Sequence, residues 1–332
     1  MATMASVCRS LRVMGVTALV AIGSVTVESV IVWRLRALAT ESIATISLVR
    51  RSGWTTSRLI ASPHATQAAV ATDRHAYAIS NTTVGQHERA TGRLVATGTA
   101  PDARHLNSGF VHEGKVYCAH SNYPAEPPES DVRMFDPATA TLTVIHRFDR
   151  PPGSLVWCVQ REGQWWCCFA WYGDENARTV LIEYADGTFN REVRRFTFPA
   201  EVIADWDRMS GSGGIWDGDT LLVSHHHFPV LYRLALPQQG TQLEFVEALT
   251  CPFPGQGIAA DPVTGGLVGI DRKHRRIVFA ERPGCPPERS PTRRPTAEEP
   301  DVSRLPSPMP RSVRRYERRR HPPRGESSGV EG

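Results

Sequence analysis

A chain of 332 residues, 41% of them hydrophobic, is long enough to bury a large core in a single domain. Its formal net charge of +4 is confined to the C-terminal part. From Pro283 onward 11 arginines face 7 acidic residues, and the difference of four equals the net charge of the chain. The part before Pro283 is therefore neutral overall. The basic pI therefore gives no argument that the folded part binds nucleic acid, and no nucleic-acid partner is expected.

The first forty residues resemble a secretory signal or an uncleaved membrane anchor. Arg9 and Arg12 precede an apolar stretch at 13–27, which is the order of charge and hydrophobicity in such a signal. Glu28 and Arg34 interrupt the apolar character, so a bilayer-spanning helix is not favoured. The alternative is a leader without a targeting function. The sequence predicts a signal or anchor at 1–40 and export to the periplasm or the extracellular space.

The pattern that organises the chain is a unit of four short strands, clearest between residues 107 and 148. Its strands are rich in β-branched and aromatic residues, and turn residues such as Glu113 and Gly114 separate them. These strands are predicted at 107–112, 115–120, 131–136 and 142–148. Internal repeats of this kind decide the fold class, so we looked for further copies.

Four more units follow the same pattern. The first is predicted at 68–71, 76–80, 84–88 and 93–97. The third is predicted at 154–159, 165–170, 180–184 and 193–198. The fourth is predicted at 214–216, 221–224, 230–236 and 243–248. The fifth has only 258–260, 267–270 and 277–281. Repeats of about 40–50 residues with four short strands each are typical of a β-propeller.

The incomplete fifth unit has a candidate partner at the other end of the domain. An isolated strand is predicted at Ser57–Ser62, just before the first unit. If this strand pairs with the fifth unit, the ring closes and no sheet edge is left exposed there. We therefore predict an all-β, monomeric propeller over residues 57–282, with five blades of four antiparallel strands closed by the N-terminal strand. Six blades stay open as an alternative if residues 40–56 contain strands.

The composition changes abruptly at Pro283. Pro, Arg, Ser and Glu dominate from there to Gly332, and aliphatic residues are rare. Such a segment cannot bury enough apolar surface to offset its loss of conformational entropy. The sequence therefore predicts a disordered Pro/Arg-rich tail at 283–332.

The seven cysteines do not indicate a disulfide framework. Their number is odd, and no Cys-x-x-Cys motif occurs. Cys118, Cys158, Cys167 and Cys168 lie within apolar strands. Buried free thiols are common in such strands, so we expect these residues to have a packing role.

Propeller geometry brings one set of loops together at the channel. The loop leading into each innermost strand and the loop between the second and third strands lie on the same face. Here these loops are rich in His, amide and aromatic residues, which predicts a polar, His-rich site at one end of the central channel. The candidates are His64, Gln67, His105, Asn107, His120, Asn122, Trp171, Tyr172, His225, His226, His227, Gln256, Asp271 and Arg272.

Three kinds of role are open to these residues. His225 and His227 alternate onto one face of a strand end and could chelate a divalent metal, the one cofactor considered. Imidazole and carboxylate groups can act as acid or base, which makes candidates of His105, His120, His226 and Asp271. The other candidates are ligand-binding residues, and the rings among them could stack on a sugar: His64, Gln67, Asn107, Asn122, Trp171, Tyr172, Gln256 and Arg272.

Several familiar catalytic motifs are missing. The serine-rich segment 210–214 lacks the Gly-x-Ser-x-Gly spacing of a nucleophile elbow. No phosphate loop, dinucleotide fingerprint or Cys-x-x-Cys zinc pattern is present. No fixed pair of carboxylates, which a glycosidase needs, is evident on the predicted rim.

Four segments resemble a group of exported bacterial β-propeller proteins, some of which are described as cycloisomerase-like. They are 105–110, 120–124, 212–216 and 255–262. The resemblance covers about residues 57–282 and implies a propeller fold and export. The segment 257–262 is also similar to inner-strand starts in gluconolactonase-type propellers. Those enzymes carry a metal-binding Glu where this chain has Gln256.

Two classes of function follow from these observations. One is an exported small-molecule enzyme, lactonase-like, cycloisomerase-like or carbohydrate-active, which the abundance of His favours. The other is a non-catalytic propeller that binds a glycan or peptide, which the missing acidic pair and catalytic triad favour. A structural scaffold is a third reading. The expected partner is a small molecule or glycan, and no stable membrane insertion is expected beyond an N-terminal anchor.

Overall fold

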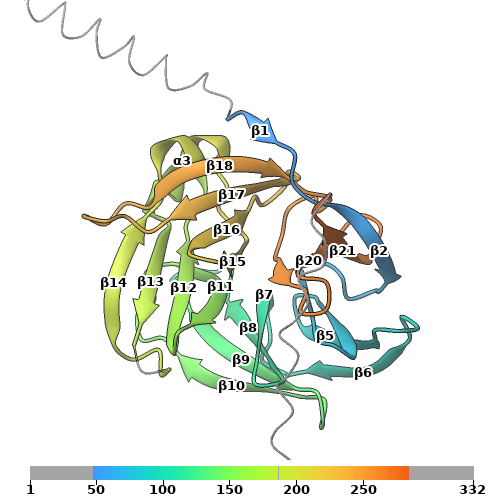
Figure 1. The fold of residues 1–332 in the computed structure, drawn as a ribbon. Coiled ribbons are helices and arrows are strands. Elements are labelled where there is room, and N and C mark those ends of the chain that lie inside the picture. The colour runs from blue at the N-terminus through green and yellow to red at the C-terminus, as the bar shows by residue number, and fades with distance from the viewer. Residues whose placement is uncertain (1–47, 186, 284–332) are drawn as a thin grey trace, which may run out of the picture. The chain divides into compact units, whose positions relative to one another are not determined.

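Short strand-forming runs separated by turns fold into five antiparallel sheets arranged as the blades of a β-propeller (Figure 1). The structure is a computed structural model that describes residues 48–185 and 187–283. We number the blades in chain order. The strands of the first blade are β3 (Ala68–Ala71), β4 (His75–Ile79), β5 (Thr83–Glu88) and β6 (Leu94–Thr99). Those of the second are β7 (His105–His112), β8 (Lys115–Ser121), β9 (Ser130–Asp136) and β10 (Thr141–Arg147).

The third and fourth blades follow the same order from the channel outward. The third contains β11 (Ser154–Arg161), β12 (Gln164–Ala170), β13 (Val180–Tyr184) and β14 (Glu192–Thr197). The fourth contains β15 (Gly213–Asp217), β16 (Thr220–Ser224), β17 (Val230–Ala235) and β18 (Glu244–Thr250). Two short helices lie in the connections, η1 (Gly173–Arg178) and α3 (Ala200–Asp205). The predicted five-blade, all-β architecture is confirmed.

The fifth blade joins the two ends of the domain. It contains β19 (Ala259–Ala260), β20 (Leu267–Asp271), β21 (Arg276–Glu281) and β2 (Thr55–Ala61). Strand β2 pairs antiparallel with β21, and Leu59 and Ile60 face Val278 and Ile277. The predicted closing strand is therefore present, and it begins two residues earlier than expected.

The six-blade alternative is wrong. Within residues 48–56, apart from the start of β2, the only strand is β1 (Arg50–Arg51). This strand lies parallel to β18 and adds a fifth strand to the fourth blade. No residues of the described part are left to build another sheet between the blades.

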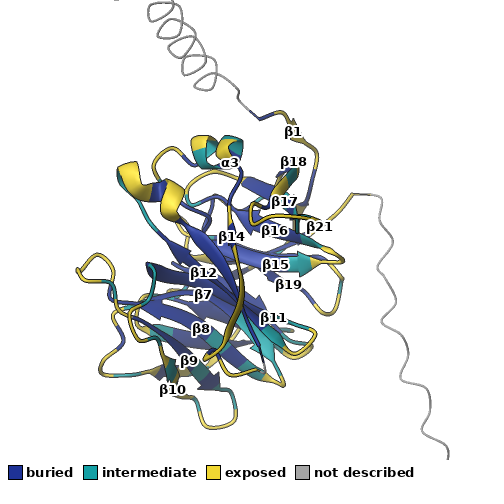
Figure 2. Cartoon of the chain, turned by 90° about the vertical axis from the view of Figure 1, so that its left-hand side faces the viewer, coloured by how far each residue is buried: buried dark blue, intermediate teal, exposed yellow. Residues whose placement is uncertain are grey.

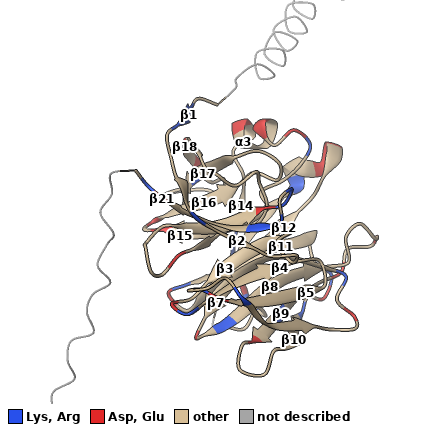
Figure 3. Ribbon diagram, turned by 90° about the vertical axis from the view of Figure 1, so that its right-hand side faces the viewer, with Lys and Arg blue, Asp and Glu red and all other residues tan. Residues whose placement is uncertain are grey.

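The hydrophobic core lies between neighbouring blades (Figure 2). One cluster joins the first blade to the second and fifth, where Tyr77 meets Phe135 edge-on with ring centroids 6.0 Å apart. Other clusters fill the spaces between the second and third, third and fourth, and fourth and fifth blades. Inner and middle strands are consequently buried on both faces, as the continuous apolar runs of β11 and β12 require. Charged side chains are concentrated in loops and at strand ends (Figure 3).

Small residues allow the inner strands to approach one another closely around the channel. A Cβ atom added at Gly257 would lie 2.6 Å from the Cβ atom of Ala68, and one added at Gly214 would lie 2.8 Å from the ring of Trp157. Real Cβ atoms do not approach this closely. Substituting either glycine would therefore push neighbouring blades apart.

An ion pair also holds the first and fifth blades together. The Arg89 guanidinium donates two hydrogen bonds to Asp261, with Nη1–Oδ1 and Nη2–Oδ2 distances of 2.6 and 2.7 Å. The Asp261 side chain is fully buried, and Arg89 also lies over the ring of Phe279. Such bidentate pairs are strongly directional. The aspartate of the 257–262 motif thus has a structural partner.

Other sequence predictions have separate outcomes. Cys118, Cys158, Cys167, Cys168 and Cys251, the cysteines of the described part, are buried and free. None of the helices in that part has the length and apolar character needed to cross a bilayer. The predictions of a signal or anchor at 1–40 and of a disordered tail concern residues outside the described ranges, apart from Pro283.

Ring closure by β2 can be tested with one pair of substitutions. Ile60 is buried in the cluster between the first and fifth blades, whereas neighbouring Leu59 is 46% exposed. Ile60→Ala should lower the free energy of unfolding by about 2–5 kcal/mol, because it leaves a cavity beside β21. Urea denaturation monitored by tryptophan fluorescence measures the loss.

Leu59→Ala is the matched control and should cost under about 1 kcal/mol, since it removes little buried surface. Equal losses for Leu59→Ala and Ile60→Ala would contradict the closure, because packing of one specific face of β2 would then not matter.

Candidate functional site

Four aromatic or imidazole rings from three blades lie in a row on the face where a site was predicted. His105 begins β7, Tyr123 lies in the loop after β8, Tyr172 follows β12, and His226 follows β16. The centroid distances are 5.5 Å from His105 to Tyr123, 4.9 Å from Tyr123 to Tyr172, and 6.2 Å from Tyr172 to His226. With Arg272, from the loop after β20, we call these residues the mouth cluster.

Burial and nearby positive charge keep the imidazoles of the mouth cluster neutral. Burial first, then repulsion from His227 and Arg272, lowers the pKa of His226 to about 3. Burial, His120 and Arg272 likewise lower the pKa of His105. Since Arg272 acts on both rings, its charge lies within electrostatic reach of both. Near pH 7 the mouth cluster therefore presents a cation beside uncharged rings.

The Tyr172 phenol and the His226 ring have further constraints. Burial raises the pKa of Tyr172, so the phenol keeps its proton at physiological pH. His226 Nδ1 lies 2.6 Å from Ser212 Oγ. This contact fixes the ring, and a neutral imidazole can accept or donate a proton through it.

Three carboxylates on this rim already have partners. Asp174 bonds to Arg208, and Glu175 bonds to Arg178 at 2.8 Å. Asp271 accepts from the His274 backbone N–H and lies 2.6 Å from its Nδ1. Burial acts to raise the pKa of Asp271, but these His274 contacts outweigh it and lower the pKa. The predicted acid–base candidate Asp271 is thus engaged within its own turn.

His225 has a different environment from the one predicted. Its Nδ1 accepts hydrogen bonds from the backbone N–H groups of His227 and Phe228, at 2.8 and 3.1 Å. Its Nε2 therefore carries the proton and donates to the carbonyl oxygen of Asp205, at 3.2 Å. Both nitrogens are used to shape the loop, and burial lowers the pKa of this ring to about 4.

The metal prediction for His225 and His227 gains no geometric support. Within residues 48–185 and 187–283, no three His, Cys, Asp or Glu side chains are grouped so that they could hold a metal ion. His227 lies against His226, with ring centroids 4.4 Å apart. A divalent metal at this rim stays a prediction from the sequence.

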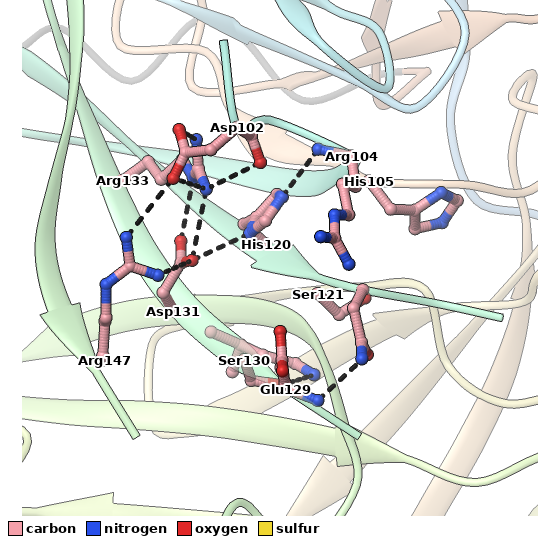
Figure 4. Close-up of polar contacts among 12 residues, drawn as sticks. Asp102, Arg104, His105, His120, Ser121, Glu129, Ser130, Asp131, Arg133 and Arg147 are labelled. Atoms are coloured by element: carbon pink, nitrogen blue, oxygen red, sulfur yellow. Dashed lines mark hydrogen bonds and ion pairs between the residues drawn. The ribbon is translucent and has the colours of Figure 1, made fainter. Parts of the chain in front are cut away.

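His120 does not join the mouth cluster. Its Nε2 accepts the backbone N–H of Arg104 at 2.9 Å, and its Nδ1 lies 3.0 Å from Asp131 Oδ2. Figure 4 shows the ring directed toward Asp131, with the His105 ring on the other side of Arg104. The sequence predicted the two residues in different loops of one face, and they lie at the same end of the paired strands β7 and β8, where their side chains have different partners.

Two of the predicted ligand-binding amides hold inner loops in place. Asn107 Nδ2 donates to the carbonyl oxygen of Leu155, at 2.8 Å, and so joins the second and third blades. Gln67 Nε2 donates to Asn81 Oδ1 at 2.6 Å within the first blade. Both amides are buried. Their polar groups are therefore largely used by the protein itself.

The other two amides have similar roles. Gln256 Nε2 donates to the carbonyl oxygen of His226, at 3.0 Å, and its backbone bonds to His225 and Ser224. Asn122 Nδ2 donates to the carbonyl oxygen of Pro127, at 2.9 Å. Gln256 thus joins the fourth and fifth blades, and Asn122 shapes the loop after β8.

The rings of Trp171 and His64 pack against neighbouring parts of their own blades. The Trp171 indole donates to the carbonyl oxygen of Pro152, and Arg178 covers its ring at 3.8 Å. His64 packs over the third strand of the first blade, because a Cβ atom at Gly85 would lie 2.5 Å from its ring. A ligand-binding role for these two residues stays a prediction from the sequence.

Sequence reasoning missed Tyr123 as a site residue and gave Ser212 no role. Tyr123 directly follows the polar run 120–122 in a rim loop, and Ser212 lies in the rim segment before β15. Both positions carried a signal, because any residue of these loops can reach the channel. Only the contacts distinguish them from neighbours that shape the loops.

Comparisons with known proteins identify no family. No protein-family model matches the sequence, and no curated protein matches it. The structure is similar to the crystal structure of Myxococcus xanthus glutaminyl cyclase, with a TM-score of 0.48 and 12% identity over 71% of this chain and 98% of that chain. It also matches the computationally designed Ika8 protein, with a TM-score of 0.32 and 7% identity over 64% and 57% of the two chains. These likenesses carry no functional argument, and the fold assignment rests on the strand pairing.

The role of His225 predicts a pH dependence of stability. Its pKa is about 4 in the folded protein, against an ordinary value of 6.5, so folding favours the neutral ring. Above pH 6.5 the ring is neutral in both the folded and the unfolded chain, and the free energy of unfolding is not reduced. As the pH falls toward 4 the unfolded chain binds the proton first, and the free energy of unfolding drops by on the order of 2–3 kcal/mol. Denaturant titrations at pH 7.5 and 4.5 measure it.

His225→Asn is the comparison variant, because its amide oxygen can replace Nδ1 as the acceptor but does not titrate. The free energy of unfolding should fall less between the two pH values in this variant than in the unsubstituted protein. Identical pH slopes would show that His225 is not held neutral by folding.

Proposed function

We propose that this protein is a binding propeller that holds a small polar molecule at the mouth of its central channel. The observation that carries the proposal is the row of four contacting rings from three blades, His105, Tyr123, Tyr172 and His226. All four of these residues are partly exposed or exposed on the rim. Rings in this arrangement offer stacking surfaces to a sugar or another flat ligand.

The charge of the mouth cluster narrows the class of ligand. Arg272 has no ion-pair partner among the described residues, and the imidazoles of His105 and His226 are held neutral beside it. A carboxylate can pair with such a guanidinium, and Asp271, the acid next to Arg272 in the chain, already has a partner in His274. We infer an acidic sugar or a similar hydroxy-carboxylate as the ligand.

Export belongs to the same proposal. Arg9 and Arg12 before the apolar stretch at 13–27 support a secretory signal or anchor. An exported propeller would meet glycans and small carboxylates in the periplasm or outside the cell. Cell fractionation of the full-length protein with a C-terminal tag tests this part, and a purely cytosolic protein would contradict it.

Ligand binding can be tested with a panel of neutral and uronic-acid mono- and oligosaccharides. Binding of an acidic member should weaken by about tenfold or more in Arg272→Gln, because the variant loses a charge-assisted contact. Tyr123→Ala should weaken both acidic and neutral members, since it removes a stacking surface. Isothermal titration calorimetry measures the dissociation constants.

Lys273→Gln is the matched control for Arg272→Gln, because it removes the neighbouring positive charge from the same loop. It should leave the dissociation constant unchanged. If no member of the panel binds, or if Lys273→Gln has the same effect as Arg272→Gln, the proposed ligand class is wrong.

The contact between Ser212 and His226 favours a second candidate function. A serine hydroxyl 2.6 Å from a neutral imidazole has the geometry of a nucleophile beside its base. This would suit a lactonase-like or cycloisomerase-like enzyme, with His105 as a further acid or base at the mouth. A pKa near 3 makes His226 a weak base, which is why binding is preferred here.

The two candidates differ in one measurement. A binding propeller should release no product from a panel of sugar and hydroxy-acid lactones followed by pH-indicator assay. Turnover by the unsubstituted protein that Ser212→Ala abolishes would favour the enzyme instead. Asp271 and His120, predicted as acid–base residues, should then contribute little, because each is engaged elsewhere.

A further inference from the structure

A separate pocket of about 350 Å³ lies on the second blade, and Figure 4 labels most of the residues that line it. It lies over the ends of β8, β9 and β10 and the loop before β7. Its volume is at the lower end of the range for small-molecule sites. Its lining residues are Asp102, Arg104, His120, Asn122, Glu129, Ser130, Asp131, Arg133, Arg147 and Phe148.

The floor of this pocket is a network of ion pairs between two arginines and two aspartates. Arg133, whose side chain is 1% exposed, donates to Asp131 and Asp102 with N–O distances of 2.9 Å to each. Arg147 reaches the same two carboxylates at 3.5 and 3.3 Å. Burial acts to raise the pKa of Asp131, but hydrogen bonds with His120 and Arg133 outweigh it and lower the pKa.

These ion pairs hold the floor rigid, and the positive and negative charges in it balance. Alternation along β9 turns Asp131, Arg133 and Phe135 to the same face, which packs against the first blade. Phe135 fills the apolar part of that contact, and the ion pairs fill the polar end. A ligand in the pocket would therefore meet a preformed surface that needs no counter-charge.

Two charged groups of the lining are unused. Among the described residues, neither the Arg104 guanidinium nor the Glu129 carboxylate has a hydrogen-bond or ion-pair partner. Their backbone groups are fixed, because the Arg104 N–H bonds to His120 and the Glu129 N–H bonds to Asn122. The pocket thus holds one free cation and one free anion at anchored positions.

The sum of charges decides which ligand fits. Three arginines and three acidic residues line the pocket, so their formal charges cancel. A simple anion on Arg104 would face Glu129, and a simple cation on Glu129 would face Arg104. A molecule that carries both charges satisfies both groups at once.

We propose that this pocket binds a small zwitterion of the free amino-acid type. Its carboxylate would pair with Arg104, its ammonium would pair with Glu129, and Phe148 would contact its side chain. Asn122 and Ser130 use their polar groups within the protein and serve as walls. This site is independent of the ligand proposed for the mouth cluster.

The test uses the purified full-length protein and calorimetric titration with the free amino acids. At least one should bind, and its N-acetyl and its carboxamide derivatives should each bind about tenfold or more weakly, because each loses one charge. Arg104→Gln and Glu129→Gln should each weaken binding of the free amino acid similarly.

Asp149→Asn and Arg150→Gln are the controls, because this exposed pair follows Phe148 outside the pocket. Both variants, and Arg272→Gln at the mouth cluster, should bind the amino acid as the unsubstituted protein does. Because Arg104 and Glu129 are exposed and unpaired, their variants should keep the unliganded melting temperature.

Three results would overturn the proposal. One is that no free amino acid binds. Another is that N-acetyl derivatives bind as well as the free amino acids and Glu129→Gln strengthens binding, which would make the pocket an anion site. The third is that neither Arg104→Gln nor Glu129→Gln changes the dissociation constant.

Discussion

Closure of the ring by β2 and β21 is the constraint on which the rest of the structure depends. A five-bladed ring is narrow, so its inner strands must approach closely, and Gly257 lies where a Cβ atom would be 2.6 Å from Ala68. The blades pack face to face over buried clusters that are each shared by neighbours. An open fifth blade would expose both an unpaired sheet edge and one apolar face.

The narrow ring also determines which polar groups are available for a ligand. Close inner strands bury the backbone groups at the channel end, and buried polar groups need partners. Asn107 and Gln256 supply such partners between blades, through Leu155 and His226. The residues left at the rim are larger and come from longer loops, which gives the mouth cluster its rings and its single guanidinium.

The free-energy cost of burying an ionisable group is offset in two different ways on this face. His225 stays neutral and uses both nitrogens for backbone groups, and burial lowers its pKa to about 4. Asp131 stays ionised, because Arg133 and His120 compensate for the loss of solvent. A buried charge without a partner would cost several kcal/mol, so each arrangement restricts what its residues can do for a ligand.

The sequence by itself determined the fold and its closure, because strand length, alternation and turn chemistry are local properties. The repeat of four strands predicted both the isolated strand before Gln67 and the missing strand after β21. The rim loops were also predictable, since propeller topology assigns them to one face. Tertiary structure alone decided which rim side chains converge. Alternation says which face of a strand a residue occupies, but only neighbouring blades decide that His120 meets Asp131 while His105 meets Tyr123.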